Sequence, residues 1–256
     1  MITILLQGYA KSPQQLKDDV DYYIKLGFNV VVSSYKEFTS MLSIEGIINN
    51  DEGEGETIQD SFQGNNLGIN KPKNYYVKFP KKFFVASGFN LNFQLCTTKR
   101  GLILIDELYP QTEYILKCRA DMRLEDLDLH CKEWISKIKL DSTILSKKLV
   151  TLGPPGISKG KNWKVFDFWI FGTKEDINKY FSIPYASAIV APESYLTTYL
   201  RNKTKEPWEV VREKYFYFTR KVPIFWHKYN GWLDNSDEKG YTGIYPKHIK
   251  NDRPTT

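Results

Sequence analysis

Apolar positions at the start of the chain form two short runs separated by an amphipathic segment. Residues 2–8 (ITILLQG) are apolar up to a polar end, and residues 28–37 contain the run VVV. Continuous runs of this length are typical of parallel strands buried on both faces. Between them, Ser12 can cap a helix that has Pro13 at its first position and Gly27 at its end. The pattern predicts a right-handed strand–helix–strand unit and an α/β fold with an open, mostly parallel sheet.

Later segments show helical spacing in some places and short apolar runs in others. The inward face of the first helix is expected to comprise Leu16, Val20, Tyr23 and Ile24. Further helices are expected over residues 90–106, 124–139, 192–203 and 206–221, and from near Thr173. Strands are expected over residues 147–155 and just before Thr173, and a long surface loop over residues 45–73. With no internal repeat or linker, we expect one domain with helices on both faces of the sheet and a C-terminal helical and aromatic elaboration from about Trp226.

Residues 114–123 (YILKCRADMR) alternate between apolar and charged side chains. In a single strand, Lys117, Arg119, Asp121 and Arg123 would all lie on one face. Charge inside a doubly covered sheet is costly unless it is paired or exposed. One hypothesis is that the row lies at the ligand-binding edge, with Asp121 toward a cation and the basic side chains toward phosphate oxygens. The alternative is an edge strand in which the charges pair with one another.

Polar residues follow the first two predicted strands. In open parallel sheets, ligands bind outside the carboxyl ends of the strands. This rule selects Gln7, Gly8 and Tyr9 after the first strand and Ser33, Ser34, Tyr35 and Lys36 after the second. Asn92 and Gln94, near the start of the helix over residues 90–106, can reach a ligand at the same edge or serve only as capping and surface residues.

Composition narrows the class of protein. The 256 residues are 41% hydrophobic and 15% aromatic, which is typical of a globular protein, and the net charge of +6 fits several kinds of anionic partner. Three cysteines without CxxC spacing argue against a disulfide framework and a structural zinc site. With no signal-peptide pattern and no apolar run long enough for a membrane span, we expect a cytoplasmic protein, either free or in peripheral contact with the inner face of a membrane.

The combined pattern NLNFQLCTTKRGL, YILKCRADMR, VFDFWIFGTKEDI and PESYL resembles the WavE lipopolysaccharide synthesis family of glycosyltransferases. The match runs from ILLQG in the first strand to about Leu200. The resemblance implies a GT-A-like, Rossmann-like fold. Residues 1–125 would bind a nucleotide sugar, such as a UDP- or GDP-sugar, and residues 126–256 would form the acceptor half and the tail. The implied acceptor is a surface glycan of lipopolysaccharide, capsule or glycoprotein, or its lipid-linked precursor.

The resemblance also implies a metal site, because GT-A enzymes usually carry two aspartates in a DxD motif. In RAD, Asp121 keeps one position and Arg119 replaces the other acid. A divalent cation, Mn²⁺ or Mg²⁺, is therefore expected at Asp121, with His227 as a second candidate ligand. For His227 the alternative is a histidine packed among aromatic residues. Arg119 and Lys117 are available to stabilise a leaving diphosphate in place of a metal.

Two acidic residues are candidates for the base that deprotonates an acceptor hydroxyl. Asp167 stands inside the apolar and aromatic run WKVFDFWIFG, where burial would raise its pKa. The alternative is a carboxylate that accepts hydrogen bonds from backbone amides or an arginine. Glu193 follows Pro192 at a predicted helix start, where it can act as a base or interact favourably with the helix dipole.

Two other function classes compete with glycosyl transfer. A nucleotidyltransferase that makes the sugar nucleotide would share the sheet, but the first strand is followed by one glycine rather than a glycine-rich phosphate loop. A non-enzymatic glycan- or nucleic-acid-binding module is suggested by the aromatic, basic segment RKVPIFWHKYNGW. The charge of the chain is too small and too dispersed for nucleic acid to be the expected partner.

Overall fold

The computed structural model describes residues 1–50, 91–140, 142–152, 165, 168–184, 192–219, 222–233, 249–251 and 253. Its centre is a seven-stranded sheet with the strand order β3-β2-β1-β4-β7-β6-β8. The strands are β1 (Ile2–Gln7), β2 (Asn29–Ser34), β3 (Ile47–Asn49), β4 (Tyr114–Arg119), β6 (Leu149–Leu152), β7 (Trp169–Thr173) and β8 (Phe216–Thr219). Neighbouring strands are parallel except at β7, which runs antiparallel to both β4 and β6.

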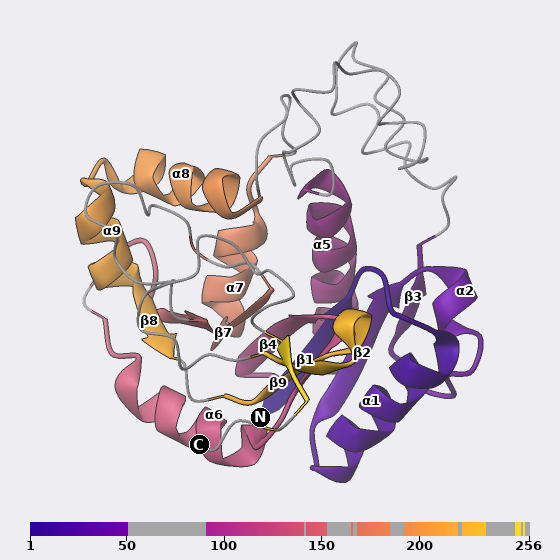
Figure 1. Ribbon diagram of the computed structural model, residues 1–256. Helices are drawn as coiled ribbons and strands as arrows, with labels where there is room; N and C mark the ends of the chain where they lie inside the picture. Colours follow the sequence, from indigo (N-terminus) through magenta and orange to yellow (C-terminus); the bar gives the residue numbers. More distant parts are fainter. Residues whose placement is uncertain are drawn as a thin grey trace, which may run out of the picture.

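Helices cover both faces of this sheet (Figure 1). One face packs against α1 (Pro13–Lys25) and α6 (Leu127–Lys137). The other packs against α5 (Leu91–Leu108), α7 (Lys174–Phe181), α8 (Pro192–Thr204) and α9 (Trp208–Tyr215). A short helix, α2 (Lys36–Thr39), follows β2. The predicted α/β architecture, with a mostly parallel sheet between two helical layers, is confirmed.

The first strand–helix–strand unit forms for the reasons that its sequence suggests. Side chains of β1 alternate between the two apolar clusters, so the strand is buried on both faces. The Ser12 hydroxyl accepts a hydrogen bond from the Gln15 amide at 3.1 Å, and Gly27 ends the helix with φ of +85°. Leu16, Val20 and Tyr23 are buried as predicted. The inward position of Ile24 was wrong, because its side chain is 45% exposed.

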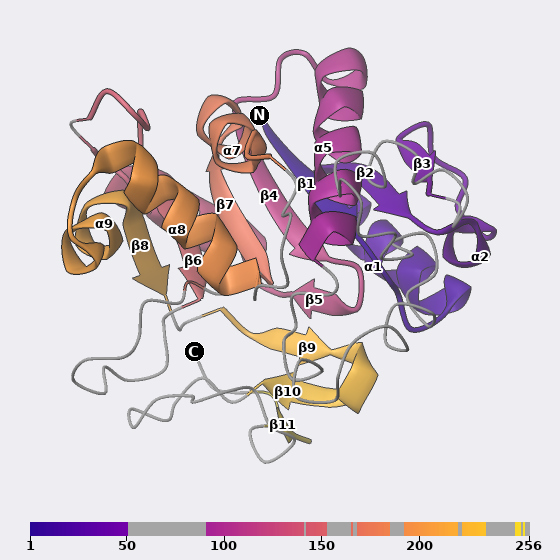
Figure 2. The same cartoon turned by 90° about the horizontal axis from the view of Figure 1, so that it is seen from above.

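A second, antiparallel sheet lies beyond the carboxyl end of β4 (Figure 2). It has the order β11-β10-β9-β5 and comprises β5 (Met122–Leu124), β9 (Ile224–Trp226), β10 (Gly231–Leu233) and β11 (Ile249–Lys250). A short 3-10 helix, η4 (His227–Tyr229), connects β9 to β10. The C-terminal elaboration is therefore partly a sheet, and part of it pairs with a segment from the middle of the chain.

The prediction that residues 114–123 form one strand with four charges on one face is wrong. β4 ends at Arg119, opposite the end of β1 at Gln7. Ala120 and Asp121 then form a turn, and Met122 begins the second sheet opposite Trp226. The strand does not continue past Arg119 because β1 offers no further backbone groups to pair with. In the second sheet, β9 supplies the backbone hydrogen-bonding partners for β5.

Two smaller predictions also need correction. Residues 47–49, placed in a surface loop, form the edge strand β3 beside β2. Residues 216–219, placed in the last helix, form β8 and pair with β6. The helix start near Thr173 is confirmed, since the Thr173 hydroxyl accepts a hydrogen bond from the Asp176 amide. The single domain with halves that divide near residue 125 stays a prediction.

No helix in the described part of the chain is both long and apolar enough to cross a membrane.

At Gly101, α5 packs tightly against the Leu5 side chain of β1. A Cβ atom built there would lie 2.3 Å from Leu5 Cδ1, and the Leu5 side chain is fully buried. We expect Gly101→Ala to lower the free energy of unfolding by about 1–2 kcal/mol, because overpacking outweighs the gain in helix propensity. Urea denaturation would measure this effect. Ile103→Ala, on the exposed side of the same helix, is the control, and an equal loss there would contradict the packing argument.

Candidate functional site

The carboxyl ends of three adjacent parallel strands bring several predicted site residues together. Gln7 at the end of β1 lies between Ser33 of β2 and Arg119 of β4 in the strand register. The Gly8 amide donates to the Ser33 carbonyl at 3.0 Å, and the Ala120 amide donates to the Gln7 carbonyl at 2.9 Å. From β1 the chain adds β2 and β3 toward one edge of the sheet, and then adds β4 on the other side of β1. The strand order therefore changes direction between β1 and β4, and open α/β sheets bind ligands at such a point.

A buried polar network joins the ends of β1, β2 and β3. The Ser34 hydroxyl donates to the Gly8 carbonyl at 2.7 Å, and the Asn50 amide group donates to the Ser33 hydroxyl at 3.0 Å. Arg100 of α5 donates to the Asn50 side-chain oxygen at 3.0 Å. Sequence reasoning missed Asn50 and Arg100. The signal for Asn50 was the short apolar pair Ile47–Ile48 before it, which indicates a strand whose end reaches the same edge.

The first half of α5 lies at this edge as well. The Thr97 hydroxyl donates to Gln7 Oε1 at 2.7 Å, and both side chains are buried. Gln94 is 9% exposed and lies one turn earlier on α5. Asn92 belongs to the first turn of α5, and its side chain lies outside the described residues. Thr97 was missed, because a threonine inside a predicted amphipathic helix gives no distinct signal.

Tyr9 and Tyr35 form a stacked aromatic pair beyond β1 and β2. Their ring centroids are 4.3 Å apart with an interplanar angle of 21°, and Phe38 meets the Tyr9 ring edge to face at 5.9 Å. Tyr35 is buried, whereas Tyr9 is 41% exposed. A rigid aromatic surface of this kind can stack against a planar ring of a ligand.

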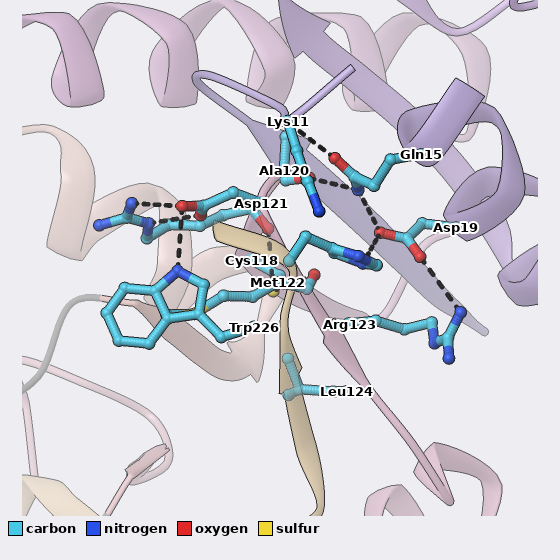
Figure 3. Close-up of polar contacts among 12 residues, drawn as sticks. Lys11, Gln15, Asp19, Cys118, Ala120, Asp121, Met122, Arg123, Leu124 and Trp226 are labelled. Carbon is cyan, nitrogen blue, oxygen red and sulfur yellow. Dashed lines mark hydrogen bonds and ion pairs between the residues drawn. The ribbon is translucent and has the colours of Figure 1, made fainter. Parts of the chain in front are cut away.

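Arg119 and Asp121 form a bidentate ion pair at the end of β4 (Figure 3). Arg119 Nε and Nη2 donate to the two carboxylate oxygens at 2.8 and 2.7 Å, and the Trp226 indole donates to Oδ2 at 3.1 Å. The guanidinium carbon lies 5.5 Å from the ring centre of Phe168 and 5.7 Å from that of Trp226. The Asp121 side chain is only 9% exposed, whereas that of Arg119 is 35% exposed.

The residues around Asp121 do not fit a divalent cation in this arrangement. Both carboxylate oxygens already accept hydrogen bonds from a guanidinium, and a cation there would have to displace Arg119. Within the described ranges, no three His, Cys, Asp or Glu side chains gather as a metal site would require. The His227 ring lies against Asp19, with Nε2 2.8 Å from Oδ2. The divalent cation stays a prediction.

Lys117 and Arg123 lie away from the edge. Lys117 is fully buried on the α5 and α7 face of the sheet, with its ammonium group 5.8 Å from the Phe181 ring centre. Arg123 belongs to the second sheet, where it donates to Glu125 at 2.9 Å and lies 3.6 Å from Asp19. Of the four charges in the alternating segment, Arg119 and Asp121 are the pair at the strand end.

The two proposed bases cannot be placed against these residues. Asp167 lies outside the described residues. Glu193 belongs to the first turn of α8, and its side chain also lies outside the described residues.

Two of the cysteine thiols are buried in the core. Burial raises the pKa of the Cys131 thiol to about 12, and burial raises the pKa of the Cys118 thiol as well. Neither thiol is therefore a nucleophile near neutral pH.

Comparison with known proteins finds distant structural likeness but no match of sequence. No family model matches the chain, and no curated protein sequence matches it. Among solved structures, the fold is similar to "a glycosyltransferase involved in the glycosylation of the major capsid of PBCV-1". The two chains share 14% identity with a TM-score of 0.40, over 85% of this chain and 80% of the other. A likeness at this level does not establish a shared activity.

Proposed function

We propose that this protein is a glycosyltransferase that binds a nucleotide sugar at the carboxyl ends of β1, β2 and β4. The observation that carries the proposal is the Arg119–Asp121 pair. It fixes a cation beside the point where the strand order reverses, with 35% of the arginine side chain exposed. The resemblance to the WavE family, which no family model matches, stays a prediction of the same reaction class from the sequence alone.

In this proposal Arg119 neutralises the diphosphate that leaves when the glycosidic bond to the donor breaks. The guanidinium is held in one orientation by two hydrogen bonds to Asp121, so little reorganisation is needed as charge develops on the leaving group. Arginine suits this task because its planar guanidinium matches the geometry of phosphate oxygens and keeps its charge at every physiological pH. A divalent cation would supply equivalent charge, and the donor set at Asp121 favours the arginine.

The nucleoside half of the donor would lie over the ends of β1 and β2. Tyr9, which is 41% exposed, can stack against the base. The buried network of Gly8, Ser34 and Asn50 keeps this edge rigid, because each polar group in it has a partner.

The acceptor half of the proposal rests on sequence. The acceptor would be a surface glycan or its lipid-linked precursor, reached in the cytoplasm or at the inner face of a membrane. Asp167 or Glu193 would take the proton from the attacking hydroxyl. The electron pair of that oxygen forms the new glycosidic bond while the bond to the diphosphate breaks.

Thermal unfolding of the full chain with a panel of nucleotide sugars tests the proposal. A ligand that binds the native state raises the melting temperature, so one donor should stand out from the others. Each donor is compared in chelator and in manganese. A shift that survives the chelator is expected. The absence of a shift with every UDP- and GDP-sugar, in both conditions, would contradict the proposed function.

A further inference from the structure

Three side chains on one stripe of α1 contact the segment that carries Asp121. Gln15, Asp19 and Tyr23 are spaced four residues apart, so they share one face of the helix. All three are buried: Gln15 is 8% exposed, and Asp19 and Tyr23 are 0% exposed. A fully buried carboxylate is costly unless surrounding groups stabilise it, so the neighbours of Asp19 are informative.

Successive residues of this stripe contact successive residues of the turn and β5. Gln15 Nε2 donates to the Ala120 carbonyl at 2.9 Å and to Asp19 Oδ2 at 2.6 Å. Asp19 Oδ1 lies 3.6 Å from Arg123 Nη1. One turn later, the Tyr23 hydroxyl accepts a hydrogen bond from the Leu124 amide at 2.9 Å. The helix therefore fixes residues on both sides of Asp121 (Figure 3).

Asp19 also reaches the C-terminal part of the chain. His227 Nε2 lies 2.8 Å from Asp19 Oδ2, and the His227 amide donates to the Asp121 carbonyl at 3.0 Å. The residue before His227 is Trp226, whose indole donates to the Asp121 carboxylate. Asp19 thus contacts both segments that hold Asp121. It reaches the turn by way of Gln15, and it reaches the end of β9 by way of His227.

From this arrangement we infer that Asp19 is a positioning residue for the Arg119–Asp121 pair. It ties the turn and the end of β9 to α1, so that the Asp121 carboxylate and the Trp226 indole hold the Arg119 guanidinium in one orientation. Asp19 itself lies behind the edge and is fully buried, so it does not touch a ligand. The catalytic consequence rests on the proposed function, whereas the positional coupling does not.

Hydrogen–deuterium exchange tests the coupling without any assay of activity. In Asp19→Asn, the His227 amide, which donates to the Asp121 carbonyl, is expected to exchange with solvent about tenfold faster or more. In the native chain, local opening has to break the contacts of the buried Asp19 charge. The variant lacks that charge, so opening costs less free energy. Asp21→Asn is the matched control, since Asp21 lies on the exposed side of the same helix and pairs with Lys17. Gln15→Met serves as the second variant if Asp19→Asn does not fold. Unchanged exchange at the His227 amide in the folded variant would overturn the inference.

Binding of UDP and GDP then tests the consequence. If Asp19 acts through Arg119, Asp19→Asn weakens diphosphate binding in the native chain but has no further effect in Arg119→Gln. A merely stabilising residue would leave the affinity of the folded protein unchanged, and equal losses in both backgrounds would also overturn the positioning role. If the native chain binds neither nucleotide, the proposed function fails, and the exchange result alone decides whether Asp19 holds the turn.

Discussion

Arg119→Gln is expected to lower turnover of the nucleotide sugar by about 100-fold to 1,000-fold, the loss typical when one oriented group that stabilises developing charge is removed. The reason is geometric as well as electrostatic. Glutamine keeps much of the length of the side chain, but it has no charge and cannot form the two-pronged contact with Asp121 seen at 2.8 and 2.7 Å. The rate of nucleoside diphosphate release from the donor identified by thermal unfolding measures this effect.

Two further variants show whether the loss is specific. Arg119→Lys keeps the charge but not the planar fork, so its rate should fall between those of the native chain and Arg119→Gln. Arg253→Gln removes an arginine that pairs with Asp126 and Glu125 and is 43% exposed, and it should leave the rate unchanged. Native-like turnover in Arg119→Gln would contradict a role for this side chain at the diphosphate.

Asp176→Ala is expected to lower the free energy of unfolding by about 3–4 kcal/mol. The Asp176 side chain is fully buried at the start of α7. Its carboxylate accepts hydrogen bonds from the Ser146 amide at 2.7 Å, the Lys147 amide at 2.9 Å and the Thr173 hydroxyl at 2.7 Å. Alanine would leave the Ser146 and Lys147 amides without their carboxylate acceptor, where the segment before β6 meets the start of α7. Urea denaturation monitored by circular dichroism would measure the loss.

Glu175→Ala is the control for that measurement. Glu175 is the preceding residue on α7, is 65% exposed, and pairs across one helical turn with Lys179. Its replacement should cost less than about 1 kcal/mol. A comparable loss for the two variants would mean that the buried carboxylate does not hold the junction.

Local sequence signals were sufficient to predict the first strand–helix–strand unit. The unit from β1 to β2 is specified by two apolar runs, the Ser12 cap and Gly27, all of which act within a few residues of their own position. The rule that ligands bind at the carboxyl ends of parallel strands then selected Gln7 and Ser33, which lie side by side. These inferences needed no knowledge of the distant chain.

The rest depended on partners far away in the sequence. Residues 114–123 alternate as one strand would, yet they divide between two sheets because Met122 pairs with Trp226, more than 100 residues later. Asp19 was not identified, since its meaning comes from His227 and from Gln15 at the turn before β5. Periodicity left open whether Arg119 pairs with Asp121, and their bidentate contact is visible only in the structure.

The most direct test of the account compares how tightly UDP, GDP and their nucleosides bind to the native chain and to Arg119→Gln in the presence of a chelator. The account predicts that the native chain binds one diphosphate about 10- to 100-fold more tightly than its nucleoside, as expected for charge-assisted hydrogen bonds to phosphate. Arg119→Gln should lose most of that preference and bind the nucleoside as before. A preference that persists in Arg119→Gln, or that exists in the native chain only with manganese, would contradict it.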